Sequence, residues 1–394
     1  MLYNTIAPLS LNRFTEVFFM IYLDNAATTG RKPYSVINAV AAALREHSAN
    51  PGRSGHSDSL RAASAVYAVR EKTAAFFGAS GPENVIFTLN CTQSLNTVIK
   101  GVLHKGDRAV TSSLEHNSVI RPLVKTGVQY ETARVSLYDD RETLAEFERK
   151  IKYGTKLVIC SGASNVLGKT LPIADIGALC RERGALFAVD AAQTAGVIPI
   201  NMKEMNIDFL CAAPHKGLYA PMGLGVLICE KMPEDTLVEG GTGTNSLEPV
   251  QPDSMPERFE SGTVALPAIM GMSAGIDYVN RIGMNKLYEH EMSLCRYLYR
   301  ELAKIDRIEL YTPEPSYGKY VPVLSFNVFG RDSSEIAQLL SDKGIAVRGG
   351  LHCAPSAHRQ AGTLEKGMVR VSVASFNTQA DIKSLVAAVK SILR

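Results

Sequence analysis

The chain has 394 residues, of which 46% are hydrophobic and 21% are charged, and its formal net charge is +3. This composition is typical of a globular protein of about two domains and excludes a disordered or fibrous chain. With so small a net charge and no dense basic run, we expect no nucleic-acid partner.

The first twenty residues, MLYNTIAPLSLNRFTEVFFM, partly resemble a signal peptide. Glu16 interrupts their apolar part, and no A-x-A cleavage pattern follows. We therefore interpret residues 1–20 as an N-terminal extension, with Met20 as a candidate natural start.

Seven short runs rich in β-branched and aliphatic residues follow, at 84–89, 108–112, 130–135, 156–161, 186–190, 208–213 and 225–230. Most are separated by helical patterns, so we expect an α/β fold with a mostly parallel sheet covered by helices on both faces. The last two runs are too close for a crossover helix. We expect them to pair as a hairpin at one edge of the sheet.

Polar residues follow five of these runs, where ligands of open α/β sheets bind. Thr92 falls at an expected helix start, which suits a phosphate, although a plain helix cap also explains it. The complete set of polar residues at these ends is Cys91 and Thr92, His116, Asn165, Asp190 and Gln193, and His215 and Lys216.

Lys216 is the one charged residue in the apolar stretch FLCAAPHKGLYAPMGLGVLIC, residues 209–229. Pro214 and Pro221 argue against a transmembrane span, because with the glycines they divide the stretch into strand, turn and strand. Two interpretations remain. Lys216 either keeps its ammonium in water or is partly desolvated, so that its amine is neutral and nucleophilic.

After residue 265 the pattern changes. A long helical pattern covers 265–305, and short strand and helix patterns follow to the C-terminus. We expect a large domain at 21–265 and a smaller α+β domain at 266–394.

The polar strand ends together suit one aromatic cofactor, pyridoxal phosphate. This cofactor needs a lysine for covalent attachment, an acid for its ring nitrogen, an aromatic group against its ring and a phosphate cradle. Lys216, Asp190 and His116 suit the first three needs, and Thr92 with His215 suits the fourth.

Several motifs carry a family resemblance: YLDNAATT (22–29), NPGRSGH (50–56), EHNS, SNVLG, VDAAQ, PHKGLYAPMGLG, FESGT (259–263), RGGLHCAP (348–355) and VRVSVASFNT (369–378). With them the chain resembles the cysteine desulfurase and selenocysteine lyase family of the class V aminotransferase fold. The resemblance implies the fold type I architecture of pyridoxal phosphate enzymes. That architecture has a large domain with a seven-stranded mixed sheet and a smaller C-terminal α+β domain, in a homodimer.

The resemblance also implies residue roles. Lys216 would hold the cofactor and move protons at Cα, Asp190 would pair with the ring nitrogen, Gln193 with the phenolic oxygen, and His116 would stack on the ring. The remaining cofactor contacts would come from Cys91, Thr92, His215 and Asn165, and from Thr263, which would reach the partner's phosphate.

The substrate residues implied by the resemblance are Arg370 and Asn165, which would hold its carboxylate, with His56 and Arg348 nearby. The substrate would be L-cysteine or L-selenocysteine.

Cys353 stands in a polar, glycine-rich loop, RGGLHCAPSAH. We expect positive charge from His352 and Arg348 to favour its thiolate. A zinc site is a weak rival, because His352, Cys353 and His358 lack the usual ligand spacing. The resemblance implies that L-cysteine becomes L-alanine while its sulfur forms a persulfide on Cys353.

The chain has seven cysteines, and Cys160, Cys211 and Cys229 lie in apolar runs. We expect these to be reduced core residues of a cytoplasmic protein with no membrane partner.

Two positions depart from the family pattern: Leu351 where histidine is frequent, and Ala213 where serine often contacts the phosphate.

Three alternatives to a desulfurase stay open: a selenocysteine lyase, a class V aminotransferase, and a non-catalytic cofactor-binding regulator or scaffold. A protein sulfur acceptor is a further possible partner.

Overall fold

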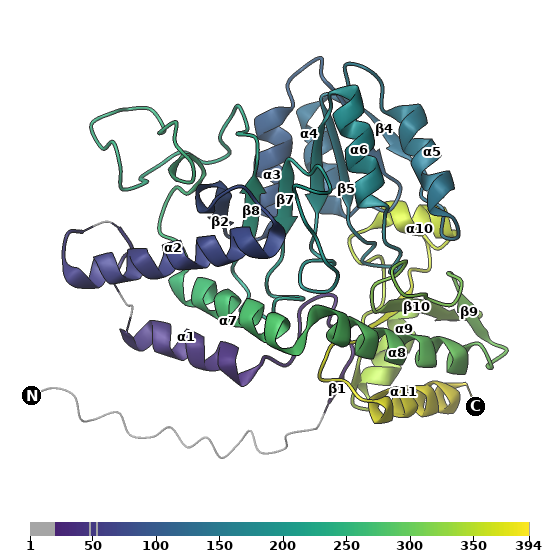
Figure 1. Ribbon diagram of the computed structural model, residues 1–394. Coiled ribbons are helices and arrows are strands. Elements are labelled where there is room, and N and C mark those ends of the chain that lie inside the picture. Colours follow the sequence, from purple (N-terminus) through teal and green to yellow (C-terminus); the bar gives the residue numbers. More distant parts are fainter. Residues whose placement is uncertain (1–19, 47–48, 53, 394) are drawn as a thin grey trace, which may run out of the picture.

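The computed structural model describes residues 20–46, 49–52 and 54–393 (Figure 1). Of the expected extension, only Met20 lies within the described residues. The central feature is a seven-stranded mixed sheet with the order β2-β8-β7-β6-β5-β3-β4, which confirms the expected fold class. In that order the strands are Val85–Thr88, Gly225–Cys229, Phe209–Ala212, Leu186–Asp190, Leu157–Ser161, Arg108–Ser112 and Gln129–Ala133.

The hairpin of β7 and β8 is confirmed, because the two strands pair in antiparallel register. Its expected place at the edge of the sheet is wrong. β2 pairs antiparallel with the other side of β8 and is itself the edge strand. Local periodicity predicts that a strand exists, but strand order is decided by which distant strand completes the hydrogen bonds.

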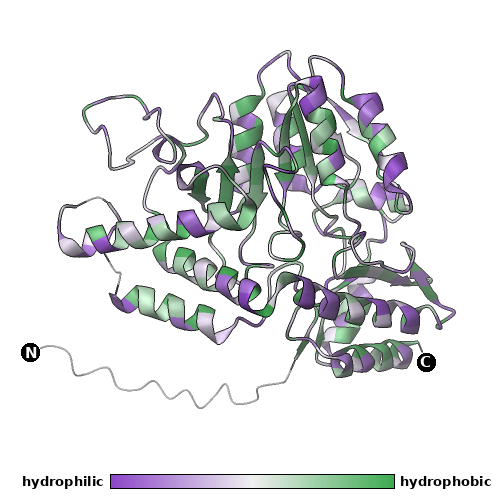
Figure 2. Cartoon of the chain, viewed as in Figure 1, coloured by the Kyte–Doolittle hydropathy of each residue, from purple (hydrophilic) through white to green (hydrophobic). Residues whose placement is uncertain are grey.

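Both faces of the sheet are buried, as side-chain alternation along β6 illustrates. Phe187 and Val189 face one hydrophobic cluster, whereas Ala188 faces another. The apolar colouring of the central strands follows from this double coverage (Figure 2). The first cluster includes α2 (Ser57–Phe77), α5 (Asp140–Lys150), α6 (Ile173–Arg183) and α7 (Leu266–Ile282), and the second includes α3 (Cys91–Val102) and α4 (Asn117–Thr126).

The long helical pattern at 265–305 forms two helices, α7 and α8 (Met284–Leu302). Gly283 separates them with a φ of 94°, a backbone conformation that favours glycine. α7 packs beside α1 (Tyr34–Glu46) and α2, whereas α8 packs against α11 (Gln379–Ile392) (Figure 1). The domain division at residue 265 stays a prediction.

The C-terminal part contains a three-stranded antiparallel sheet of order β12-β10-β9, Val369–Ser372, Val323–Val328 and Ile308–Leu310. α9 (Ser333–Ser341) and α11 pack together beside it. Near the start of the described chain, β1 (Ile21–Tyr22) pairs in parallel with β11 (Ile345–Ala346), and Leu23 joins the same core. The motif at 22–29 is thereby tied to the C-terminal part.

Within the ranges that the structure describes, no helix is both long enough and apolar enough to cross a membrane. The apolar stretch at 209–229 instead forms β7, a turn that carries Lys216, and β8.

Candidate active site

β3, β5, β6 and β7 are parallel, so their carboxyl ends meet at one edge of the sheet. The segments that follow these strands and β2 surround one hollow. It is lined by Ala213 and by eight of the predicted site residues: Cys91, Thr92, His116, Asn165, Asp190, Gln193, His215 and Lys216.

Lys216 is half-buried in the turn between β7 and β8. Its backbone N–H donates to the backbone carbonyl of Ala213 at 3.1 Å. Burial lowers the pKa of Lys216 most, and the charge of Arg370 lowers it further, while Asp190 opposes the shift. These surroundings favour the neutral, nucleophilic amine over a lysine with its ammonium in bulk water.

Asp190 ends β6 and is 5% exposed. Its Oδ1 accepts a hydrogen bond from the N–H of Ala192 at 2.9 Å and another from Sγ of Cys91 at 3.6 Å. The sheet therefore fixes a carboxylate deep in the hollow, opposite in charge to any protonated ring nitrogen bound there.

His116 caps the N-terminus of α4. Its Nδ1 accepts from the N–H of Ser118 at 3.1 Å and lies 2.9 Å from the Ser118 hydroxyl. Burial lowers the pKa of His116, although Asp190 opposes the shift, so the ring is neutral at neutral pH. With Nδ1 used as an acceptor, the proton resides on Nε2, and the flat ring can stack against an aromatic ligand.

The N-terminus of α3 also opens into the hollow. Asn90 caps this helix by accepting from the N–H of Gln93 at 2.9 Å, and Thr92 shares a 2.8 Å hydrogen bond with Ser118. Nδ1 of His215 is buried without a partner, and burial lowers its pKa to about 4. An unpaired buried nitrogen beside a helix N-terminus suits a phosphate.

Arg370 on β12 is 1% exposed. One guanidinium nitrogen donates to Oδ1 of Asp24 at 2.5 Å and another to the carbonyl of Asn165 at 3.0 Å, while Nε is buried without a partner. Arg348 is joined to Arg370 through backbone hydrogen bonds of 2.8 and 3.2 Å. Two arginines are thus anchored close enough to influence Lys216 electrostatically.

Cys353 is exposed, in a second hollow that also touches Thr92 and His116. His352 and Cys353 have φ values of 50° and 57°, in the left-handed region that few non-glycine residues adopt. Two hydrogen bonds hold this backbone: Asn117 N–H donates to the carbonyl of Cys353 at 2.7 Å, and the Asn165 amide donates to that of His352 at 2.8 Å.

The expectation that His352 carries a positive charge is wrong. His352 is 2% exposed, its Nε2 lies 3.0 Å from the carbonyl of Met368, and burial lowers its pKa to about 3. The ring is therefore neutral and contributes no positive charge to the Cys353 thiol.

Comparison with known proteins matches residues 21–385 to the family described as aminotransferase class-V. The chain belongs to the aminotransferase class-V family. The chain is similar in sequence to a probable cysteine desulfurase of Methanothermobacter thermautotrophicus. The two are 34% identical over 93% of this chain and 92% of the relative.

Solved structures of the family agree in fold. The apo structure of a cysteine desulfurase from Thermococcus onnurineus has a TM-score of 0.85 and 32% identity, covering 95% of this chain and 94% of that one. A cysteine desulfurase from Escherichia coli, described as an S-sulfonic acid form, has a TM-score of 0.84 and 26% identity with the same coverage. The class-V fold therefore extends over nearly the whole chain.

Besides Arg348, Cys353 and Arg370, two further predicted residues of this class-V chain, His56 and Thr263, do not line the hollow. Nδ1 of His56 accepts from the N–H of Ser59 at 3.2 Å and caps α2, and the Thr263 hydroxyl accepts from Asn50 at 3.4 Å. Their roles stay predictions. In the described part of the chain, no group of three or more histidine, cysteine or acidic side chains could hold a metal ion.

Sequence reasoning missed two acids of this site. Asp24, in the motif at 22–29, is the partner of Arg370. Glu115, next to His116 in the sequence, is fully buried; it accepts from the Ser112 hydroxyl and from the N–H and hydroxyl of Ser161, so it joins the ends of β3 and β5. Burial raises the pKa of Glu115 to about 7. The available signal was an acidic residue two or three positions after the end of a strand.

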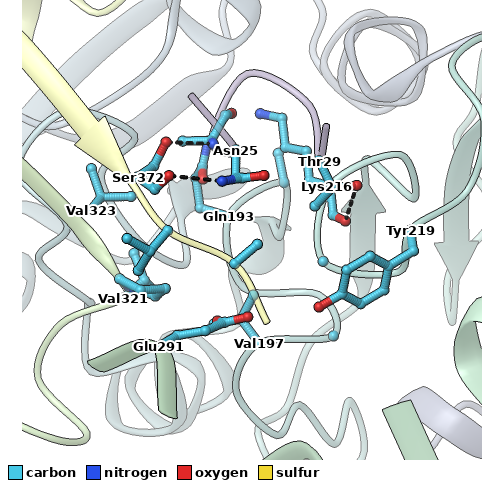
Figure 3. A pocket seen from close by; sticks show the side chains of 17 residues that line it. Asn25, Thr29, Gln193, Val197, Lys216, Tyr219, Glu291, Val321, Val323 and Ser372 are labelled. Atoms are coloured by element: carbon cyan, nitrogen blue, oxygen red, sulfur yellow. Dashed lines mark hydrogen bonds between the residues drawn. The ribbon is translucent and has the colours of Figure 1, made fainter. Parts of the chain in front are cut away.

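A third acid was also missed. Glu291 on α8 and Tyr219 line a small hollow on another side of Lys216, together with Gln193 and Ser372 (Figure 3). Glu291 is 5% exposed, and burial raises its pKa to about 8. A neutral carboxylic acid therefore lies in a hollow that Lys216 also lines.

Proposed function

We propose that this chain is a pyridoxal phosphate-dependent cysteine desulfurase, which converts L-cysteine to L-alanine and takes the sulfur as a persulfide on Cys353. One observation carries the proposal. The exposed thiol of Cys353 lies beside His116, which also lines the hollow that gathers Lys216 and Asp190. Similar sequences and structures that are described as cysteine desulfurases support the same reaction.

The residues of the hollow fit pyridoxal phosphate. The amine of Lys216 would hold it, Asp190 would face the ring nitrogen, and the neutral ring of His116 would lie against its face. Gln193 would face its phenolic oxygen, and Thr92, His215 and the N-terminus of α3 would hold the phosphate. When bound, the cofactor supplies an electron sink for the electron pair left at Cα after deprotonation.

The substrate's own groups would meet other side chains. Nε of Arg370 is buried without a partner, and a guanidinium suits the carboxylate of an amino acid. Lys216, with its lowered pKa, can accept the Cα proton as a neutral amine.

The sulfur step needs a nucleophile. The Cys353 thiolate attacks the substrate sulfur, so a new S–S bond forms while the C–S bond breaks. The electron pair of the C–S bond goes to the carbon, which gains a proton and becomes the methyl group of alanine. The persulfide remains on Cys353.

The test is to load the purified protein with cofactor and incubate it with L-cysteine and, separately, L-selenocysteine. We expect alanine together with sulfide, released when a reductant clears the persulfide, and borohydride reduction followed by peptide mapping should label Lys216. Efficient turnover of selenocysteine alone would favour the lyase alternative. Amino-group transfer to a keto acid without sulfur release would favour the aminotransferase, and no turnover would favour a non-catalytic protein.

A further inference from the structure

The hollow that contains Cys353 lies against α3 and α4 and has a volume of about 460 Å³. Three of its lining residues are cationic: Lys100 in the last turn of α3, and Arg121 and Lys125 one turn apart on α4. α3 and α4 pack against each other. The backbone carbonyl of Cys353 accepts a hydrogen bond from the N–H of Asn117 in the first turn of α4. The thiol and the three cations are thus held on one local framework.

These cations have no internal counter-ion. Within the described ranges, the side chains of Lys100, Arg121 and Lys125 form no hydrogen bond or ion pair, and no carboxylate lines the hollow. Some other surface cations do have a partner, as Arg149 has Glu146 at 2.9 Å. What marks this hollow is that three such cations line it together and no carboxylate does.

Like charges that face one concave surface repel one another and create a positive potential, which an anion would relieve. Asn96 and Thr92 add polar groups to the same wall. A hollow of this size falls within the range of small-molecule sites. The observed chemistry therefore fits a small anion that approaches the sulfur of Cys353.

We propose that this hollow binds a small anionic thiol, which accepts the sulfur from Cys353. This inference rests on the proposed function, because it needs a persulfide at Cys353. The acceptor thiolate attacks the outer sulfur of the persulfide, so a new S–S bond forms while the bond to Cys353 breaks. Cys353 leaves as a thiolate and takes up the proton lost by the acceptor thiol, and there is no net oxidation.

The experiment separates loading from transfer. The cofactor-loaded protein is first treated with L-cysteine, excess substrate is removed, and the persulfide on Cys353 is quantified by intact-protein mass spectrometry. Its loss is then timed with three thiols of similar size: 2-mercaptoethanesulfonate, 2-mercaptoethanol and cysteamine, which are anionic, neutral and cationic. Variants Arg121→Gln and Lys125→Gln are compared with Lys105→Gln, which removes the same charge from an exposed position outside the hollow.

We expect Arg121→Gln and Lys125→Gln each to slow transfer to the sulfonate thiol by roughly 2- to 5-fold, the effect of one exposed charge pair. Transfer to the neutral thiol should be unaffected, and transfer to the cationic thiol should be equal or faster. Each thiol is compared between variants, so its intrinsic reactivity cancels. Lys105→Gln should behave as wild type, and added salt should reduce the advantage of the sulfonate.

Equal effects of Arg121→Gln on all three thiols would overturn the proposal. It would also be overturned if a cysteine-containing polyglutamate peptide alone showed the charge effect, because an acidic protein acceptor would then fit better. Failure of the proposed function looks different, since no persulfide would form on Cys353 before any thiol was added.

Discussion

At the scale of single residues, the reactive groups of this chain differ in how far their side chains are exposed to water. Lys216 and His116 are drawn toward their neutral forms because burial penalises charge, whereas Cys353 is exposed. Glu291 shares a hollow with Lys216 and is neutral for the same reason. Burial therefore sets the protonation of the groups that would handle the substrate's protons, while Cys353, the proposed sulfur carrier, stays accessible.

The first prediction concerns Glu291→Gln. Folded Glu291 has a pKa of about 8, against an ordinary value of 4.5, so the folded chain keeps a proton that the unfolded chain loses. Glu291 thus makes the free energy of unfolding fall as pH rises from about 4.5 to about 8. Glu291→Gln should remove this part of the fall and be more stable than wild type at pH 8 by up to about 4 kcal/mol, with little difference near pH 4.

Urea unfolding of both proteins across this pH range provides the measurement. Parallel stability curves would contradict a protonated, buried Glu291.

The second prediction concerns Arg370→Lys. A lysine keeps the charge next to Asp24 but loses the planar fork that can hold a carboxylate by two hydrogen bonds. We expect KM for L-cysteine to rise by roughly 10-fold, equivalent to about 1.4 kcal/mol, with cofactor binding retained. Steady-state kinetics give KM and absorption spectra give cofactor content. An unchanged KM would remove Arg370 from the substrate site.

At the scale of elements, α7 supports the turn that carries Lys216. A Cβ at Gly275 on α7 would lie 1.8 Å from the carbonyl oxygen of Leu218, two residues after Lys216. A Cβ at Gly177 on α6 would lie 1.9 Å from that of Met205, outside the hollow. The two glycines permit equally close packing, but only Gly275 packs against the lysine turn.

The third prediction uses this matched pair. Gly275→Ala and Gly177→Ala should each lower the free energy of unfolding by about 1–3 kcal/mol, because backbone must move to make room. Only Gly275→Ala should also weaken cofactor binding, since it displaces the turn of Lys216. Thermal unfolding and cofactor titration measure the two effects. Equal loss of cofactor affinity in both variants would show a general effect of instability.

Element by element, the sequence predicted the central sheet well. The runs at 108–112 and 186–190 coincide with β3 and β6, because short runs rich in β-branched and aliphatic residues are typical of strands. The place of β8 was predicted wrongly, since pairing with distant β2 leaves no local signal.

For the site, spacing after the strands predicted the shared hollow, because parallel strands end at one edge. The charge of His352 was predicted wrongly, because its burial depends on packing against the chain near Met368. The pairing of Asp24 with Arg370 joins residues 346 positions apart, so it could not be read from local pattern.

At the scale of the whole molecule, the segment between β8 and α7 presents apolar side chains to solvent. Leu247 is 98% exposed and Val250 is 70% exposed. The same segment carries Thr263, which we expect to reach the cofactor site of a second chain. Val238 of the same segment is 48% exposed, and exposed apolar residues that gather into a patch are typical of surfaces that another chain covers.

The fourth prediction is that the protein forms a homodimer through this segment. Sedimentation equilibrium should give the mass of two chains, and Leu247→Glu with Val250→Glu should shift the equilibrium toward one chain. The control variant Tyr153→Glu changes an exposed residue on another part of the surface and should leave the dimer intact. A monomeric wild type would also remove the basis for the role of Thr263.

The central claim is that Cys353 accepts the sulfur of L-cysteine, and the most direct measurement compares alanine release by wild type and Cys353→Ser. The hydroxyl of serine is a far weaker nucleophile than a thiolate, so the variant should lose on the order of 10²-fold or more of its activity. Its cofactor absorption should be retained, because Cys353 does not line the hollow of Lys216. Alanine release by Cys353→Ser at the rate of wild type would contradict the account.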